Sequence, residues 1–229
     1  MNKKYEFTGE VKVYEGRILH RIKRIKDGLI GGWIEKEENL SHEGNCFVYD
    51  EGKVYDNGKV YDNGMVFGNG LVFDYGEVFD NGLVFEDGKV YGDGIVCDDG
   101  EVCGNGKVYG DGMVYGNGIV FDYGMVYGKG EVFGKGEVSG DGEVFKGKIT
   151  GRVSLPYKDI FQYQCEKRML TAILTEDDEI LYTIGCQENI TKEVFLDRIY
   201  NEDGGLEENP YRKEYLKLIP AIEMYFGIK

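Results

Sequence analysis

The sequence predicts a mainly β protein built around a parallel β-helix. Valine recurs at every sixth position from Val48 to Val144, seventeen times without a gap. Glycine recurs with the same period from Gly52 to Gly142, and most units have the form G-x-V-[YF]-[DG]-[NDYK]. A period of six fits neither an amphipathic helix nor an ordinary alternating strand, but it fits a coil of short strands joined by corners.

Each repeating unit combines a strand signal with a corner signal. A β-branched valine beside an aromatic ring favours a strand, and the Asp, Asn and Gly that follow tolerate the positive φ of a corner. Three units make one triangular turn, and successive turns pair about 4.8 Å apart. The segment from Cys46 to Gly147 therefore predicts about five to six coils with valines in the bore. A set of hairpins is the alternative, although strands of about three residues are too short to be stable.

The repeat resembles that of the hexapeptide-repeat, left-handed parallel β-helix family. In that family an aliphatic residue points inward and a small residue precedes it by two, and Val and Gly take these places here. Many relatives have Ala where this chain has Gly, which implies a slimmer bore or freer corners.

A closer resemblance covers nearly the whole chain. The lead-in GGWIEKEENLSHEGN, the VYDN-type repeats and the strand end Gly185-Cys186-Gln187 look like a family of hexapeptide-repeat proteins encoded by bacteriophages and prophages. This resemblance implies a phage or mobile-element origin. The family brings no agreed catalytic residues to carry over.

Segments on both sides of the repeat are predicted to cap it, because an open coil exposes unpaired backbone groups. We expect an N-terminal β cap over residues 1–45, the β-helix over 46–153 and a small α+β domain over 154–229. The cap has an apolar alternation, a lone Trp33 that we expect in its core, and a basic cluster. The alternation involves Val11, Val13, Ile18, Ile22, Ile25 and Ile30, and the cluster is Arg21, Lys23, Arg24 and Lys26.

The C-terminal domain is predicted to contain three strands and two helices. The strands cover 161–165, 169–174 and 179–186, with a turn over 176–179. Thr191 is placed to cap a helix over 192–200. Asn209 and Pro210 suit the start of a second helix, in which Pro220 predicts a kink.

The charge balance limits the classes of partner. The net charge is -15 with a pI near 4.6, and residues 46–148 hold 19 acidic against 8 basic residues. This argues against binding to a nucleic-acid backbone and favours basic partners or cations. Five cysteines without a CxxC pair, and no signal peptide or membrane span, predict a reduced, soluble, cytoplasmic protein, in the host cytoplasm if phage-encoded.

The three sides of the predicted helix differ in composition, because every third unit lies on the same side. We name them the tyrosine face, the apolar face and the acid-edged face. The tyrosine face carries Tyr55, Phe73, Tyr91, Tyr109, Tyr127 and Phe145; the apolar face carries Tyr49, Phe67, Phe85, Cys103 and Phe121, flanked by Phe47, Met65, Leu83 and Ile119; the acid-edged face carries Tyr61, Phe79, Cys97, Tyr115 and Phe133, with Asp62, Asp80 and Asp98 at its edge.

Two of these faces supply the candidate binding residues. They are the rings of Tyr55, Phe73, Tyr91, Tyr109 and Tyr127 and the carboxylates of Asp62, Asp80 and Asp98. The structural alternatives are ring stacking that only stiffens the sheet and acids that are merely solvated. An exposed apolar side usually marks an interface, so we also expect a homo-oligomer.

Enzymatic chemistry has little support in the sequence. Hexapeptide acyltransferases need a histidine near the coils as general base, whereas His20 and His42 both precede them and no loop interrupts the repeat to form a coenzyme A pocket. Cys97 and Cys103 fall on different faces without a neighbouring histidine. We expect no catalytic residue, no cofactor and no metal site.

The sequence thus favours a non-enzymatic, phage-derived binding protein. We expect it to inhibit a host defence component, such as a basic nucleic-acid-binding protein, through the acidic and aromatic surface of the β-helix or through the C-terminal domain. A variant is that it sequesters a signalling nucleotide by stacking bases on the rings. The rod has few basic residues, so the N-terminal basic cluster would supply the phosphate contacts. A self-assembling scaffold or virion component is the alternative, and a hexapeptide-type acyltransferase is a further, weaker one.

Overall fold

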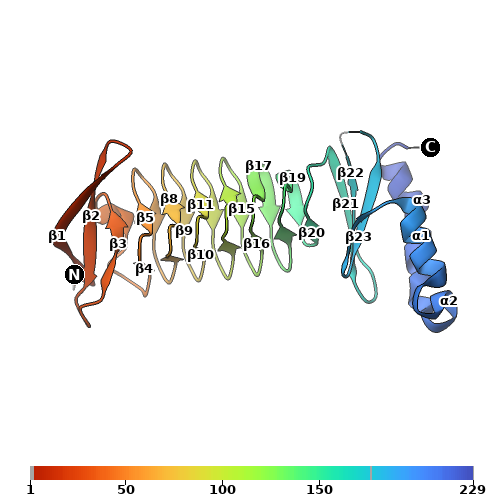
Figure 1. Ribbon diagram of the computed structural model, residues 1–229, viewed down its shortest axis with the longest axis horizontal. Helices are drawn as coiled ribbons and strands as arrows, with labels where there is room; N and C mark the ends of the chain where they lie inside the picture. Colours follow the sequence, from red (N-terminus) through yellow and green to blue (C-terminus); the bar gives the residue numbers. More distant parts are fainter. Residues whose placement is uncertain (1–2, 176, 229) are drawn as a thin grey trace.

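The chain folds into an elongated rod with a different cap at each end (Figure 1). A computed structural model describes residues 3–175 and 177–228. An antiparallel hairpin lies at the N-terminal end, a β-solenoid forms the middle, and a sheet with helices closes the C-terminal end. None of the helices in these ranges is long and apolar enough to cross a lipid bilayer.

The solenoid consists of short parallel strands stacked in three columns, one on each face. The apolar face contains β4 (Phe47–Val48), β7 (Met65–Val66), β10 (Leu83–Val84), β13 (Glu101–Val102), β16 (Ile119–Val120), β18 (Glu137–Val138) and β20 (Arg152–Val153). The tyrosine face contains β5 (Lys53–Val54), β8 (Leu71–Val72), β11 (Lys89–Val90), β14 (Lys107–Val108) and the first residues of β17 (Met125–Val132) and β19 (Glu143–Ile149). The acid-edged face contains β6 (Lys59–Val60), β9 (Glu77–Val78), β12 (Ile95–Val96), β15 (Met113–Val114) and the last residues of β17 and β19.

These columns confirm the predicted mainly β architecture with parallel coils. The expected five to six coils are too few, because the apolar face stacks seven strands. The extra length comes from segments without the repeat motif. Val153 pairs with Val138 at one end, and Ile34 pairs with Val54 at the other.

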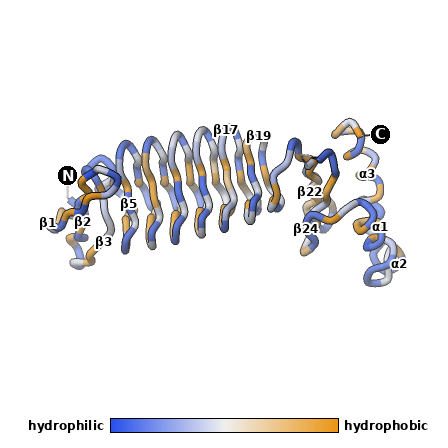
Figure 2. The backbone as a smooth tube through the Cα atoms, turned by 45° about the horizontal axis from the view of Figure 1, so that its top comes forward, coloured by the Kyte–Doolittle hydropathy of each residue, from blue (hydrophilic) through white to orange (hydrophobic). Residues whose placement is uncertain are grey.

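The register of the coils is 18 residues. Val84 lies between Val66 and Val102 in neighbouring strands, and the amide of Lys53 donates to the carbonyl of Gly70 at 2.9 Å. All seventeen repeat valines are at most 1% exposed. Figure 2 shows the result as hydrophobic segments that recur from coil to coil. The bore is therefore a continuous apolar core.

The corners explain why Asp and Gly alternate after the aromatic position. Eight non-glycine residues in the repeat have a positive φ: Asp50, Asp56, Asp62, Asp74, Asp80, Glu86, Asp98 and Asp122. Glycines with a positive φ occupy the equivalent place in other units, for example Gly68 and Gly92. Asp reaches this left-handed conformation more easily than most residues, and Gly does so without strain.

A glycine also stands two places before each valine of the repeat from Val54 to Val144, and the close contact between neighbouring coils requires it. A Cβ at Gly100 would lie 2.6 Å from the carbonyl oxygen of Val114 in the next coil, and one at Gly58 would lie 2.7 Å from that of Val72. These glycines do not have a positive φ, so space rather than conformation selects them. A bore built with Ala at this position would need coils placed differently.

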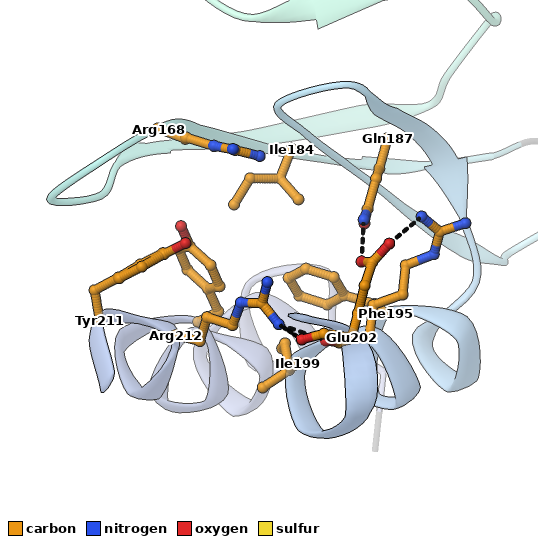
Figure 3. A pocket seen from close by; sticks show the side chains of 10 residues that line it. Arg168, Ile184, Gln187, Phe195, Ile199, Glu202, Tyr211 and Arg212 are labelled. Atoms are coloured by element: carbon orange, nitrogen blue, oxygen red, sulfur yellow. Dashed lines mark hydrogen bonds and ion pairs between the residues drawn. The ribbon is translucent and has the colours of Figure 1, made fainter. Parts of the chain in front are cut away.

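The C-terminal domain packs helices against one side of a four-stranded antiparallel sheet. Its elements are β21 (Asp159–Gln164), β22 (Met169–Leu174), β23 (Ile180–Ile184), β24 (Gln187–Ile190), α1 (Lys192–Asn201), η2 (Glu202–Gly204), α2 (Gly205–Glu208), η3 (Pro210–Arg212) and α3 (Lys213–Tyr225). The core contains Ile184 on the sheet and Phe195 and Ile199 on α1 (Figure 3). The rings of Tyr182 and Phe195 stack at 4.9 Å.

Most of the predicted elements of this domain are present, with two differences. The fourth strand, β24, was not expected. Thr191 caps α1 as predicted, with its hydroxyl accepting from the amide of Val194, but the Asn209 side chain donates to the carbonyl of Asp203 and caps no helix. The helix α3 continues through Pro220, and the kink expected at this residue stays a prediction. The predicted turn over 176–179 includes residue 176, which lies outside the described residues.

The C-terminal sheet also closes the end of the bore. Residues on β22 alternate between the two sides of the sheet: Ile173 belongs to the solenoid core, whereas Leu170 and Ala172 face the helices. Tyr157 extends the solenoid core toward the same sheet. One sheet thus serves as the cap of the rod and as the base of the helical layer.

The N-terminal cap switches an antiparallel sheet into the parallel solenoid. Strands β1 (Tyr5–Tyr14) and β2 (Arg17–Arg24) pair antiparallel, and β3 (Ile30–Ile34) pairs antiparallel with β2 but parallel with β5. Trp33 is 4% exposed, which confirms the expectation that it is a core residue.

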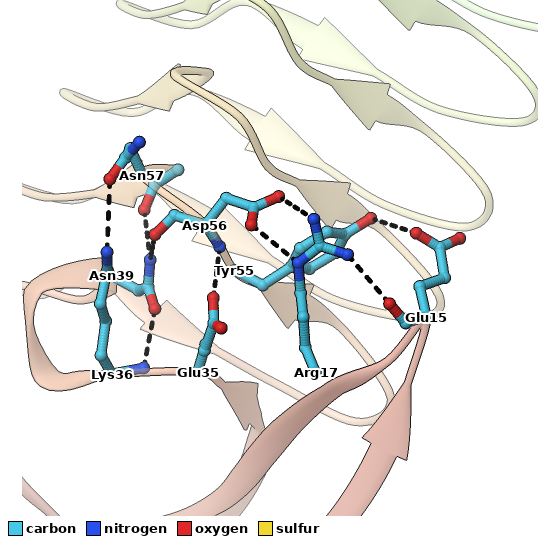
Figure 4. A network of polar contacts seen from close by, with 9 residues as sticks. Glu15, Arg17, Glu35, Lys36, Asn39, Tyr55, Asp56 and Asn57 are labelled. Carbon is cyan, nitrogen blue, oxygen red and sulfur yellow. Dashed lines mark hydrogen bonds and ion pairs between the residues drawn. The ribbon is translucent and has the colours of Figure 1, made fainter.

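Polar contacts fix this cap to the first coil (Figure 4). The guanidinium of Arg17 donates to both carboxylate oxygens of Asp56 at 2.7 and 2.8 Å. The amide of Asp56 donates to Glu35, and the Asn39 side chain donates to the carbonyl of Gly58 at 2.8 Å. The contacts of Glu35 and Asn39 satisfy main-chain groups that the first coil would otherwise leave unpaired.

Candidate functional site

The tyrosine face carries an unbroken ladder of stacked rings. From Tyr55 through Phe73, Tyr91 and Tyr109 to Tyr127, consecutive ring centroids are 4.9 to 5.0 Å apart and the rings are within 5° of parallel. The next ring, Phe145, is tilted by 36° at 6.3 Å. The structure therefore brings all five predicted aromatic residues together.

Their spacing limits what the ladder can bind. Each inner ring is covered on both sides by its neighbours, and insertion of a base would need about 7 Å between rings, twice the van der Waals contact distance. Tyr55, at the start of the ladder, is 1% exposed and lies beneath Arg17. The ladder presents ring edges and hydroxyl groups to solvent, which does not suit the base stacking expected from the sequence.

The tyrosine hydroxyls remain protonated donors. Burial, together with its hydrogen bond to Glu143, raises the pKa of Tyr127 to about 12. Burial likewise raises the pKa of Tyr91 and Tyr109. The Tyr127 hydroxyl donates to Glu143 at 2.8 Å. The ladder therefore supplies neutral polar groups and no phenolate.

The predicted acidic residues form a separate ridge on a corner of the rod. Asp62, Asp80 and Asp98 are exposed and have φ values of 52°, 49° and 51°. Glycines at positive φ continue the same column at 116 and 134. This column requires a positive φ, and Asp can adopt it. The ridge lies apart from the tyrosine ladder.

Hydrogen bonds beside this ridge hold the next column together. Asn45 donates to Asn63, Asn63 to Asn81, and Asn81 to Asp99, at 3.0, 3.4 and 3.2 Å. Across residues 3–175 and 177–228, no three His, Cys, Asp or Glu side chains are grouped so as to hold a metal ion. The like charges on the ridge are spread along solvent-exposed corners.

The two cysteines interrupt the other ring columns. Phe67 stacks on Phe85 at 4.9 Å and Tyr61 on Phe79 at 4.8 Å, but Cys103 and Cys97 take the next places. Burial raises the pKa of both thiols to about 11. They are protonated near neutral pH and are poor nucleophiles.

A wide groove between the N-terminal hairpin and the first coil was not among the predicted sites. Its volume is about 720 Å³, within the range of small-molecule sites. Five of its described lining residues are basic and none is acidic. The lining consists of Lys3, Lys4, Arg24, Ile25, Lys26, His42, Gly44, Asn45, Cys46, Phe47, Tyr49 and Met65.

The cations of this groove differ in how they are held. Lys3 pairs with Glu37 at 2.7 Å and Arg24 pairs with Asp27 at 2.7 Å. The Lys4 ammonium donates to the Cys46 sulfur at 2.9 Å. Lys26 is exposed and has no ion-pair partner among the described residues. The groove therefore contains both positioned and free positive charge.

His42 adds an unused hydrogen-bonding group to the groove. Its Nδ1 accepts from the amide of Lys4 at 3.2 Å, so a neutral ring carries its proton on Nε2. Nε2 is enclosed and has no hydrogen-bond partner in the described chain; the nearest carboxylate, Glu37, is 3.9 Å away. A buried donor without a partner is costly unless a ligand or water completes it.

Two of the four residues of the predicted basic cluster line this groove. Arg24 and Lys26 line it, whereas Arg21 and Lys23 pair with Glu51 and Glu6 elsewhere. The contributions of Lys3, Lys4 and His42 depend on the fold of the hairpin. No protein-family model matches the chain, and no curated protein matches its sequence significantly.

Proposed function

We propose that this chain is a non-enzymatic binding protein that captures a nucleotide-sized anion in its N-terminal groove. The observation that carries the proposal is a groove of about 720 Å³ whose lining, over the residues that the structure describes, has five basic residues and no acidic one, in a chain of net charge -15. In such a chain, a cavity lined by one sign of charge concentrates ligands of the opposite sign.

The groove also offers apolar contacts of the kind that a nucleobase uses. Tyr49 and Met65 are half-buried and line the groove, whereas Phe47 is fully buried and supports the Tyr49 ring edge to face at 4.9 Å. Tyr49 is the first ring of its column, so no ring of a preceding coil covers it. We therefore favour a ligand with both phosphates and a base over a simple anion.

The wider setting follows from the resemblance of the repeat. We propose that the solenoid is the left-handed form, built from three six-residue units per coil, and that the protein comes from a phage or prophage. Capture of a signalling nucleotide in the host cytoplasm would then interrupt a host defence that depends on that nucleotide. We further propose a homo-oligomer, formed through the apolar face.

Calorimetric titration at low ionic strength tests the ligand class. ATP serves as the probe, pyrophosphate lacks the base, and adenosine lacks the charge. We expect ATP to bind more tightly than pyrophosphate and adenosine not to bind, because charge attracts the ligand and the rings add to its affinity. Equal affinity for ATP and pyrophosphate would reduce the site to a phosphate groove, and no binding of either would refute the proposal.

A charge reversal locates the site. Lys26→Glu removes the free cation and is expected to weaken ATP binding roughly tenfold, about 1.4 kcal/mol. Lys89→Glu makes the same change of net charge on the tyrosine face and should leave the affinity unchanged. Equal losses in the two variants would show a general charge effect and no specific groove.

A second candidate function rests on the exposed acidic corners of the rod. Tyr75 and Tyr123, on the two corners other than that of Asp62, Asp80 and Asp98, each follow an aspartate at positive φ and are 62% and 64% exposed, and Tyr is enriched in protein interfaces. A basic host defence protein is the partner that such a surface fits. The triple variant Asp62→Asn, Asp80→Asn and Asp98→Asn keeps side chains that tolerate positive φ, so it should fold while losing salt-sensitive capture of that partner.

Light scattering after size-exclusion chromatography separates both functions from the scaffold alternative. A binding protein is expected to form a small oligomer of fixed mass. Assemblies that grow with concentration would favour a self-assembling scaffold or virion component, and would count against both binding proposals.

A further inference from the structure

The C-terminal domain contains a second polar pocket, between its sheet and its helices. Side chains from the β21–β22 loop, the start of β24, α1, η2, η3 and α3 converge on it (Figure 3). Its volume is about 40 Å³, roughly three times what one water molecule requires. The pocket is too small for a nucleotide, and it lies at the opposite end of the rod from the N-terminal groove.

An arginine without a partner borders this pocket. The Arg168 side chain has no hydrogen bond or ion pair in the part of the chain that the structure describes, whereas its neighbour Lys167 lies 4.0 Å from Glu166. The guanidinium lies beside the β23–β24 turn, where a Cβ on Gly185 would be 2.2 Å from its Nη1. Gly185 therefore leaves the space that the Arg168 side chain occupies.

A buried hydroxyl without a partner completes the polar lining. Tyr215 is 5% exposed, and its hydroxyl is enclosed with no hydrogen-bond partner among the described residues. Burial raises the pKa of this phenol to about 12, so it stays a donor. An enclosed donor of this kind carries a desolvation cost unless an acceptor meets it.

Two further arginines add positive charge and are rigidly held. Arg212 donates to the carbonyls of Arg198 and Glu202, at 2.8 and 2.6 Å. Arg198 lies 3.6 Å from the Glu202 carboxylate, to which Gln187 also donates. Arg212 also lies 3.6 Å from the Asp203 carboxylate. Among the described lining residues, three are arginines, and Arg168 is the one whose charge no carboxylate offsets.

We propose that this pocket binds a phosphoryl group through Arg168 and the hydroxyl of Tyr215. The planar guanidinium donates in a fork that matches an oxyanion, and multiple cations favour a dianion over a monoanion such as acetate. The volume admits one phosphoryl group and little else. The ligand is either free phosphate or the phosphate at the end of a larger molecule.

Calorimetry on the full chain with inorganic phosphate tests the arginine. Arg168→Gln should weaken phosphate binding at least tenfold. Lys167→Gln removes the same charge one residue away, outside the lining, and should leave the affinity within twofold. Lys26→Glu in the N-terminal groove should also leave it unchanged, which separates this site from the groove proposed above. Equal loss in Arg168→Gln and Lys167→Gln would overturn the proposal.

The Tyr215→Phe variant is expected to change the melting temperature differently in the absence and in the presence of phosphate. Without phosphate the variant should melt at the same or a higher temperature, because it removes a buried hydroxyl that lacks a partner. With phosphate the unchanged chain should gain thermal stability, whereas the variant should gain little. A lower melting temperature in both conditions would show that the hydroxyl is structural and would count against the site.

Three probes compared in the same titration identify the source of the group. Tighter binding of O-phosphoserine than of inorganic phosphate would assign a phosphorylated molecule as the ligand, and equal binding would assign the free ion. Either outcome supports the site. Acetate binding as tightly as phosphate, or no binding of any probe, would refute a phosphoryl site.

Discussion

The solenoid and the C-terminal domain both bury apolar cores, but they use their residues in different ways. In the solenoid, an inner valine such as Val84 lies between two other valines, one in the coil above and one in the coil below. In the C-terminal domain, each core residue has its own surroundings, such as Phe195 between the rings of Tyr182 and Tyr215. Repetition makes a surface that is extended and regular, whereas the irregular domain makes a small pocket with one specific set of groups.

The largest expected effect comes from a charge in the bore. Val102→Asp places a carboxylate at a fully buried position with no partner, which should cost about 4 kcal/mol or more of unfolding free energy. Chemical denaturation followed by circular dichroism measures this. Asn105→Asp adds the same group at an exposed corner and should change stability by less than about 0.5 kcal/mol. Similar losses in the two variants would show that the bore is not a closed core.

A cavity in the C-terminal core should have a smaller and more local effect. Leu170→Ala removes a fully buried side chain and should cost about 2 to 5 kcal/mol. Because solenoid coils contact mainly their neighbours, amide hydrogen exchange should increase in residues 159–225 and stay slow in the middle coils. Equal acceleration in both regions would show that they unfold as one unit.

Filling a gap in a ring column should stabilise the solenoid. Cys97→Phe places a ring between Phe79 and Tyr115, and a ring pair is worth about 0.5 to 1.5 kcal/mol. Phe is preferred to Tyr because residue 113, which would face the hydroxyl, is methionine rather than the glutamate that accepts from Tyr115. Thermal denaturation against Cys97→Ser, which adds no ring, measures the gain. A lower melting temperature for the Phe variant would contradict an open slot.

The smallest expected effect is a pH dependence at the N-terminal hairpin. The hydrogen bond from Arg24 lowers the pKa of Asp27 to about 2, below the unfolded value of about 3.9. This carboxylate therefore contributes stability above about pH 4 that is lost as the pH falls toward 2. Asp27→Asn should lose less stability than the unchanged chain over this interval. An equal loss of stability in the variant and the unchanged chain would show that the Arg24–Asp27 ion pair does not stabilise the fold.

The sequence predicted the solenoid well because its signals repeat. The period of the valines set the parallel coils, and the alternation of Asp and Gly at one position indicated a positive φ. The number of coils was underestimated because Ile34 and Val153 join the ladder without the motif. Strands continue to pair wherever main-chain groups are suitably placed, so the end of the repeat motif does not mark the end of the solenoid.

The sites were harder to predict because they depend on contacts between distant segments. Asp62 and Tyr91 were correctly assigned to outer positions, but only the 4.9 Å ring spacing shows that a base has no room between the rings. Lys4 and His42 meet through a hairpin whose register no short motif encodes. Arg168 and Tyr215 are 47 positions apart in the sequence, and neither belongs to a pattern that would single it out.

The register of 18 residues determines how the rod can lengthen or shorten in evolution, when repeat units are gained or lost. Gain or loss of three units would move the two end domains about 4.8 Å farther apart or closer together and preserve their relative orientation. Gain or loss of a single unit would instead turn one end about the rod axis by a third of a turn. Duplication of three units therefore changes the separation of the ends alone, whereas duplication of one unit changes their mutual orientation as well, and neither needs redesign of an end.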